Sequence, residues 1–212
     1  MHTVESPEAM FELGKRIGSL CKAGDLILLN GPLGAGKTVF VQGVGAALGI
    51  SDVTFLNYVD GHLEPTIALR KDIVRQIRRV QPDRIVCQSP ERNWERIGAS
   101  HPDHLAAGEA TIQAVYPDAR NPFAFTDLLE NEGLQPWKVK EVWMQGHTHP
   151  DHFVDITDTF HFKIAALKEH ASQTGHMENL EQMLREWGQR NAGVGELPEG
   201  RIAEAFKIVN TN

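Results

Sequence analysis

A glycine-rich run near the start of the sequence has the composition of a phosphate-binding loop. Residues 31–38 read GPLGAGKT and match the P-loop (Walker A) pattern G-x-x-x-x-G-K-[ST] at every fixed position. Glycines let successive backbone N–H groups converge on an anion, and the N-terminus of a following helix adds its dipole. In such a loop Lys37 reaches the terminal phosphates and Thr38 ligates Mg²⁺. The run predicts a site for ATP with Mg²⁺, or for phosphate, that is formed by Gly31, Leu33, Gly34, Ala35, Gly36, Lys37 and Thr38.

Nucleotide hydrolysis also needs an acidic residue at a neighbouring strand end, because Mg²⁺ is held from that side as well. Asp60 follows an expected strand over residues 53–59 and is the candidate metal residue beside Thr38. The other expected strand ends carry Gln88 and Gln145 and offer no acid. An Asp-Gly pair is also a common turn, so Asp60 has a purely structural alternative. Any ATPase activity is therefore expected to be weak.

Two histidines and a carboxylate lie together at residues 101–104, HPDH. Imidazole and carboxylate groups this close in sequence can supply a metal ligand and a proton-transfer group together. His101, Asp103 and His104 are therefore candidate site residues. The alternative is a solvated helix start, at which Asp103 is favoured by the helix dipole. A second copy of the four letters stands at residues 149–152.

Hydrophobic patterning predicts alternating strands and helices that would position these residues. Strands are expected at 26–29, 53–59, 84–88 and 139–145, helices at 6–22, 37–48, 67–79, 105–115, 156–172 and 177–190, and a mixed helix-then-strand segment at 202–209. Such alternation implies right-handed βαβ units. We therefore predict an α/β fold, a three-layer Rossmann-like sandwich with a mostly parallel sheet, whose first strand–loop–helix is of the P-loop type.

Length and composition suit one globular domain over residues 1–212. Lys and Arg total 21 against 28 Asp and Glu, and a net charge of −7 disfavours nucleic acid as a partner. The apolar runs fall short of the roughly 20 residues of a membrane span, and the first residues do not resemble a signal peptide. We expect a cytoplasmic protein with no membrane partner. Cys21 and Cys87 are too few and too distant for a disulfide framework.

Before residue 50 the pairs Leu13-Gly14 and Gly24-Asp25 precede residues 33–38, LGAGKT. With these motifs, residues 6–50 resemble the N-terminal part of the TsaE family, small bacterial P-loop ATPases of tRNA threonylcarbamoyl-adenosine synthesis. The resemblance implies binding of ATP with Mg²⁺. The later segments of that family, including its acidic strand end, have no counterpart after residue 50.

A second series of motifs follows the junction. In order they are residues 58–61, 81–83, 101–104 with Gly108, 154–158, Lys163, 166–167, 170–173 and 203–206. With them, residues 53–212 resemble the LmbE-like, or PIG-L, N-acetylglucosaminyl deacetylases, which use zinc to remove acetyl groups from sugar-linked substrates. The resemblance implies that His104 ligates zinc and that His101, beside Asp103, steadies the intermediate or shuttles a proton. The other ligands and the base of that family lie in an Ala-His-Pro-Asp-Asp stretch, and residues 30–34, NGPLG, occupy its place here.

The sequence is thus interpreted as a P-loop segment, residues 1–50, joined near Gly49–Asp52 to a deacetylase-derived segment, residues 51–212. Engineering and natural fusion both explain such a chimera. Three functions stay open: phosphate or nucleotide binding without full catalytic activity, zinc-dependent N-acetyl hydrolysis, and a folded chain without activity. The first is our prediction, because the phosphate-binding loop is complete while each catalytic set lacks members.

Overall fold

The computed structural model describes residues 6, 12, 15, 54–168, 174 and 176–212. The chain divides into two compact units. The sheet unit consists of Leu56–Val154 with Ala205–Asn212, and the helical unit of residues 1–55 with Asp155–Glu204. The predicted P-loop, Gly31 to Thr38, and the strand and helix expected on either side of it lie outside the described residues.

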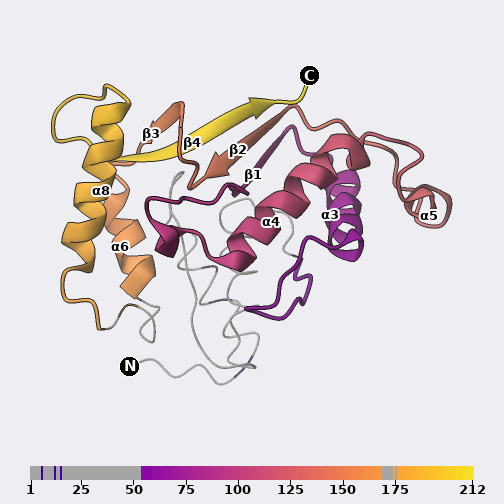
Figure 1. Cartoon of the computed structure of the whole chain (residues 1–212), viewed down its shortest axis with the longest axis horizontal. Helices are drawn as coiled ribbons and strands as arrows, with labels where there is room; N and C mark the ends of the chain where they lie inside the picture. Colours follow the sequence, from indigo (N-terminus) through magenta and orange to yellow (C-terminus); the bar gives the residue numbers. More distant parts are fainter. Residues whose placement is uncertain (1–5, 7–11, 13–14, 16–53, 169–173, 175) are drawn as a thin grey trace. The chain divides into compact units, whose positions relative to one another are not determined.

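A four-stranded sheet runs in the order β1-β2-β4-β3 (Figure 1). Its strands are β1 (Arg84–Gln88), β2 (Glu141–Gln145), β3 (His152–Asp155) and β4 (Ala203–Asn210). β1 and β2 are parallel with Arg84 opposite Glu141, whereas β2 and β4 are antiparallel with Glu141 opposite Asn210. Among the described strands the sheet is therefore mixed, and the mostly parallel sheet that we predicted is not confirmed.

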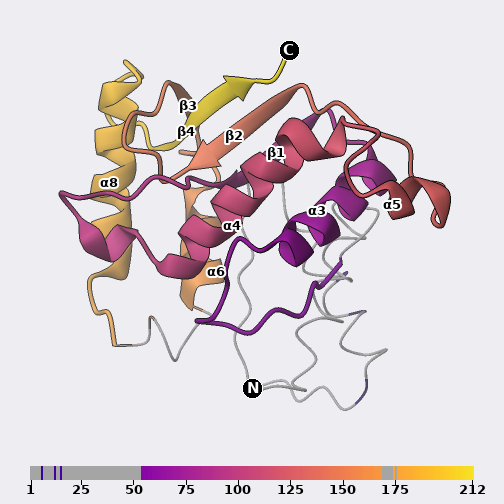
Figure 2. The same cartoon turned by 45° about the vertical axis from the view of Figure 1, so that its right-hand side comes forward.

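Two helices of the sheet unit lie side by side on one face of the sheet (Figure 2). α3 (Ile67–Val80) begins after Thr66, whose side chain accepts a hydrogen bond from the backbone N–H of Leu69. α4 (Pro102–Gln113) begins earlier than predicted, because Pro102 takes the first helical position and His101 caps the helix. Both predicted helices are confirmed. The buried residues between helices and sheet are Val74, Ile77, Ala114, Val115, Ala119, Leu128, Val139, Val142 and Met144.

The segment between α4 and β2 is irregular and is anchored by one buried arginine. It contains a short kinked helical stretch, η2 (Ala114–Ala119), and a single turn, α5 (Thr126–Glu130). Arg78 of α3 is 1% exposed. Its guanidinium donates to the backbone carbonyls of Asp118, Ala119, Asn121 and Ala124 at 2.9–3.2 Å. These bonds tie the segment to α3.

The helical unit contributes α6 (Phe160–Lys168) and α8 (Leu180–Val194), close to the predicted helices. Glu12 and Lys15 are helical too, in agreement with the helix predicted over 6–22. Within this unit the ammonium of Lys163 pairs with the carboxylate of Glu204. None of the helices in the described part of the chain has the length and apolar character needed to cross a lipid bilayer.

Two strand predictions were wrong in detail. Residues 54–59 are not a strand, and Phe55, Tyr58 and Val59 are exposed, from 39% for Tyr58 to 66% for Val59, whereas Leu56 is half-buried. A strand needs a buried face as well as β-forming residues, and this segment buries little of its apolar surface. Residues 203–210 are extended throughout, without the helical start that we considered. β3 was not predicted at all.

Candidate functional site

The carboxyl ends of β1 and β2 meet at one edge of the sheet because the two strands are parallel. The backbone N–H of Ser89 donates to the carbonyl of Gln145 at 2.8 Å. This bond holds together the segments that follow β1 and β2. Ser89 and Ser100 are buried, and their hydroxyls accept the backbone N–H groups of Glu91 (3.1 Å) and Asn93 (2.8 Å). The loop after β1 is therefore fixed by hydrogen bonds at this edge.

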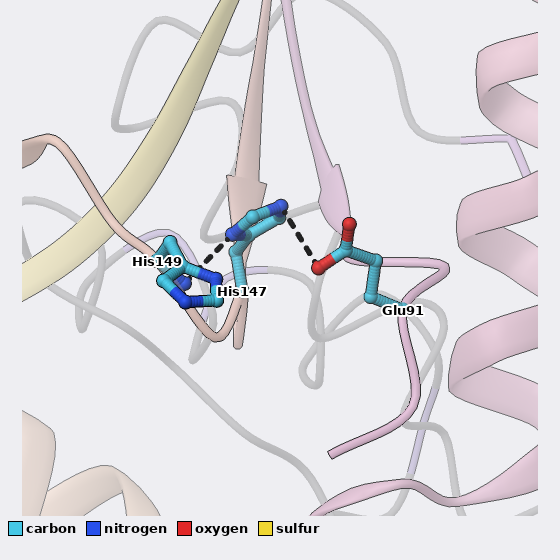
Figure 3. A group of neighbouring side chains, drawn as sticks. All are labelled: Glu91, His147 and His149. Atoms are coloured by element: carbon cyan, nitrogen blue, oxygen red, sulfur yellow. Dashed lines mark hydrogen bonds and ion pairs between the residues drawn. The ribbon is translucent and has the colours of Figure 1, made fainter. Parts of the chain in front are cut away.

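Glu91, His147 and His149 converge at this edge and form what we call the edge cluster (Figure 3). One potential ligand atom from each lies within 4.8 Å of the others. Nε2 of His147 is 3.2 Å from Oε2 of Glu91. The His147 side chain is only 10% exposed, whereas that of Glu91 is 53% exposed. The cluster thus has one well-packed imidazole and an opening to solvent.

Hydrogen bonds within the turn 147–149 orient the edge cluster. The backbone N–H of His149 donates to Nδ1 of His147 at 2.9 Å. The hydroxyl of Thr148 donates to Oε2 of Glu91 at 3.1 Å and lies 3.0 Å from Nδ1 of His149. Because one hydroxyl carries one proton, a Thr148 hydroxyl that donates to Glu91 can only accept the ring N–H of His149.

The predicted residues His101, Asp103 and His104 lie at the first turn of α4. Their arrangement is largely that of a helix start: Nδ1 of His101 accepts the backbone N–H of Asp103 at 3.2 Å. The two imidazole rings lie 5.3 Å apart, centroid to centroid. His101 and His104 are both exposed. The structure therefore brings the two histidines together at a solvent-facing helix end.

Asp103 is used to hold the Asp60-Gly61 turn. Its carboxylate accepts the backbone N–H groups of Gly61 at 2.6 Å and Leu63 at 3.3 Å. Gly61 has φ +80°, a conformation that glycine adopts readily. The turn expected at Asp60-Gly61 is present. A role for Asp60 in metal binding stays a prediction, since its proposed partner Thr38 lies outside the described residues.

α4 carries His104 toward the edge that holds the edge cluster. Gly108 packs so closely on the chain leaving β1 that a Cβ there would lie 2.4 Å from the carbonyl oxygen of Gln88. His104 is one helical turn before Gly108 and so shares its face. The helix start and the exit of β1 therefore border the same region of the sheet unit.

The second HPDH run is divided between two tasks. His149 belongs to the edge cluster, but Asp151 forms an ion pair with Lys207 at 2.6 Å and accepts the backbone N–H of Ile208 at 2.9 Å. These contacts hold the pKa of Asp151 below its ordinary value. The His152 ring packs edge-on against Trp143 with the centroids 4.5 Å apart.

Our reading of the sequence noted His149 only as part of a repeated run and did not select Glu91 or His147. A signal was available, since β2 ends at Gln145 and His-x-His follows after the single residue Gly146. Cys87 on β1 is largely buried, and burial raises the pKa of its thiol to about 11.

Two protein families match the chain. The family described as threonylcarbamoyl adenosine biosynthesis protein TsaE matches residues 4–58. The family described as GlcNAc-PI de-N-acetylase, PIG-L, matches residues 40–115. Both resemblances deduced from the sequence are thereby confirmed. The two matches overlap over residues 40–58, which includes the junction that we predicted.

The individual relatives also fall into two groups, deacetylases and TsaE proteins. The chain is 33% identical over 126 residues to the diacetylchitobiose deacetylase of Thermococcus kodakarensis, over 59% of this chain and 45% of that protein. It is 44% identical over 59 residues to the TsaE protein of Streptomyces coelicolor, over 27% of this chain and 40% of that protein. The chain thus spans less than half the length of each of these relatives.

Solved structures establish the class of fold. The N,N'-diacetylchitobiose deacetylase of Pyrococcus horikoshii superposes with a TM-score of 0.69 at 24% identity, over 96% of this chain and 80% of that one. A conserved protein of Thermus thermophilus superposes with a TM-score of 0.58 at 23% identity, over 95% and 89% of the two chains. The chain has an α/β fold with a mixed sheet, similar to that of the PIG-L deacetylases.

Proposed function

We propose that the chain binds the phosphates of a nucleotide, ATP with Mg²⁺ or a related phosphate ligand, through residues 31–38. The observation that carries the proposal is the complete P-loop pattern within the segment that matches the TsaE family. Lys37 would neutralise the terminal phosphates and Thr38 would ligate Mg²⁺. Asp60 is the proposed second metal residue.

Binding without rapid hydrolysis is the expected behaviour. Efficient phosphoryl transfer needs an acidic metal residue and also a group that orients the attacking water. Asp60 is the single candidate for the first role, and no candidate for the second was found in the sequence. Residues 40–58, where the two family matches overlap, end the TsaE-like part of the sequence. We therefore propose a chimeric chain in which a P-loop segment has joined a deacetylase-like fold.

Calorimetric titration of ATP with Mg²⁺ into the metal-stripped protein tests this function. Lys37→Ala should abolish the heat of binding, whereas Lys15→Ala, a lysine outside the loop, should leave it unchanged. Parallel titrations with ADP and inorganic phosphate separate nucleotide binding from simple anion binding. Equal affinity in the wild type and Lys37→Ala would contradict the proposal.

A second candidate is zinc-dependent deacetylation, which the fold and the paired imidazoles of His101 and His104 favour. A catalytic zinc needs three protein ligands and an open position. The resemblance supplies His104 alone, since residues 30–34 replace the stretch with the remaining ligands. The donor set is thus incomplete for that zinc site. Release of acetate from N-acetylglucosamine oligomers, lost in His104→Ala, would establish this activity, and no release at any zinc concentration would refute it.

A further inference from the structure

We propose that the edge cluster, Glu91, His147 and His149, is a binding site for a divalent transition metal, with zinc as the best-suited ion. The proposed ligands include neither His104 nor any residue of the P-loop motif. It is formed by two chain segments that meet only because β1 and β2 pair in parallel.

The donors suit zinc in number and kind. Two imidazoles and one carboxylate form a set found in zinc sites, with the fourth tetrahedral position left for water. Two ligands bound to zinc at about 2.0–2.1 Å in a tetrahedron lie about 3.3 Å apart. Nε2 of His147 and Oε2 of Glu91 already lie 3.2 Å apart. A ring nitrogen of His149 also lies within 4.8 Å of ligand atoms of the other two residues.

The hydrogen bonds prepare His149 for coordination. Its Nδ1–H is bound by the Thr148 oxygen, so the lone pair of Nε2 is available to a metal. The Thr148 proton is in turn directed at Glu91. Thr148 therefore acts as a positioning residue that orients two of the three ligands, as second-layer partners do in metal sites.

His147 must change its tautomer when metal binds. In the metal-free structure Nδ1 accepts the N–H of His149, so the ring proton is on Nε2 and points at Glu91. Coordination through Nε2 moves that proton to Nδ1 and opens the bond from His149. The metal thus takes the place of the proton between His147 and Glu91, and the ¹⁵N shifts of this ring should report the change.

Zinc titration of the metal-stripped full-length protein against a chromophoric chelator tests the site. We expect one equivalent in the wild type, and its loss in His147→Ala, His149→Ala and Glu91→Gln. Matched controls are His161→Ala, an exposed histidine of the helical unit, and His104→Ala. Both should keep the full equivalent. Cobalt(II) should give the intense visible bands of a tetrahedral site in the same set of proteins.

Variants of Thr148 distinguish a specific loss of zinc binding from a general loss of folding. Thr148→Ala should weaken zinc binding by about 10- to 100-fold, the usual effect of removing a second-layer partner, while Thr148→Ser should restore it. Far-ultraviolet circular dichroism checks that each variant is folded. Zinc binding that survives the loss of both His147 and His149, or that disappears in His104→Ala, would overturn the proposal. Because Lys37→Ala tests the P-loop without zinc, the two proposals can fail independently.

Discussion

At the scale of single residues, identical letters serve different purposes in the two HPDH runs. Asp103 accepts the N–H groups of Gly61 and Leu63, and Asp151 pairs with Lys207. Neither carboxylate is a member of the edge cluster, which takes only His149 from these runs. The residue types thus identify possible ligands, while backbone donors nearby decide which carboxylates are already engaged.

Asp103→Ala should lower the free energy of unfolding by about 1.5–3 kcal/mol, because two backbone donors lose a charged acceptor. Asp103→Asn should lose less, since its amide oxygen can still accept. Urea unfolding of each variant measures the effect, with Asp158→Ala, an exposed aspartate, as the control. An unchanged urea midpoint together with loss of a zinc-dependent activity would instead favour the catalytic role that the sequence suggested for Asp103.

The edge cluster shows the limit of residue-level prediction. HPDH is recognisable because its members are adjacent in sequence. Glu91 and Thr148, by contrast, are 57 positions apart and meet through the parallel pairing of two strands. Strand pairing is a non-local property, and no spacing rule within one segment reveals it.

At the scale of elements, the packing of α4 on the exit of β1 depends on one small residue. The backbone of Gln88, Ser89 and Pro90 fills the space that any side chain at position 108 would need. This close approach brings the first turn of α4, with His104, to the edge of the sheet. The helix itself was predictable from its pattern and from Pro102, but the demand for glycine at 108 arises only from the partner element.

Gly108→Ala should therefore destabilise the protein by about 1–3 kcal/mol, because the clash involves backbone atoms that cannot rotate away. Gly193→Ala is a matched control, since it is also a helical glycine but has nothing within 4 Å of the added Cβ. The control should be neutral or more stable by about 0.5–1 kcal/mol. Urea unfolding of both variants measures these changes in stability. Equal changes for Gly108→Ala and Gly193→Ala would show that α4 can shift away from β1 at little cost.

At the scale of the whole molecule, the α/β class was predictable because helical and strand periodicities alternate along the sequence. The order of the strands was not. β4 enters between β2 and β3 and runs antiparallel to β2, a choice that depends on which sheet edge is free. The segment 54–59 shows the converse error, since it contains β-forming residues yet leaves Phe55, Tyr58 and Val59 exposed.

Acid sensitivity is a property of the whole molecule, because several carboxylates act together. Ion pairs or hydrogen bonds hold the pKa of four carboxyl groups below their ordinary values. Lys71 does so for Asp127, Arg84 for Glu141, Lys207 for Asp151, and the hydroxyl of Thr157 for Asp155. As the pH falls, the unfolded chain binds protons before the folded one does, so these groups lose their stabilising effect.

Stability should accordingly be level near neutral pH and fall from about pH 5 downward, as the carboxylates are titrated first in the unfolded and then in the folded chain. Asp151→Asn removes one contributor. It should lower the urea midpoint at pH 7. The difference from the wild type should shrink as the pH falls below the ordinary aspartate range, because Asp151, whose pKa is lowered by Lys207, then becomes protonated in the folded chain as well. Urea unfolding of both proteins at a series of pH values checks this. Two curves that stay a constant distance apart would mean that the pair of Asp151 with Lys207 contributes nothing to the acid response.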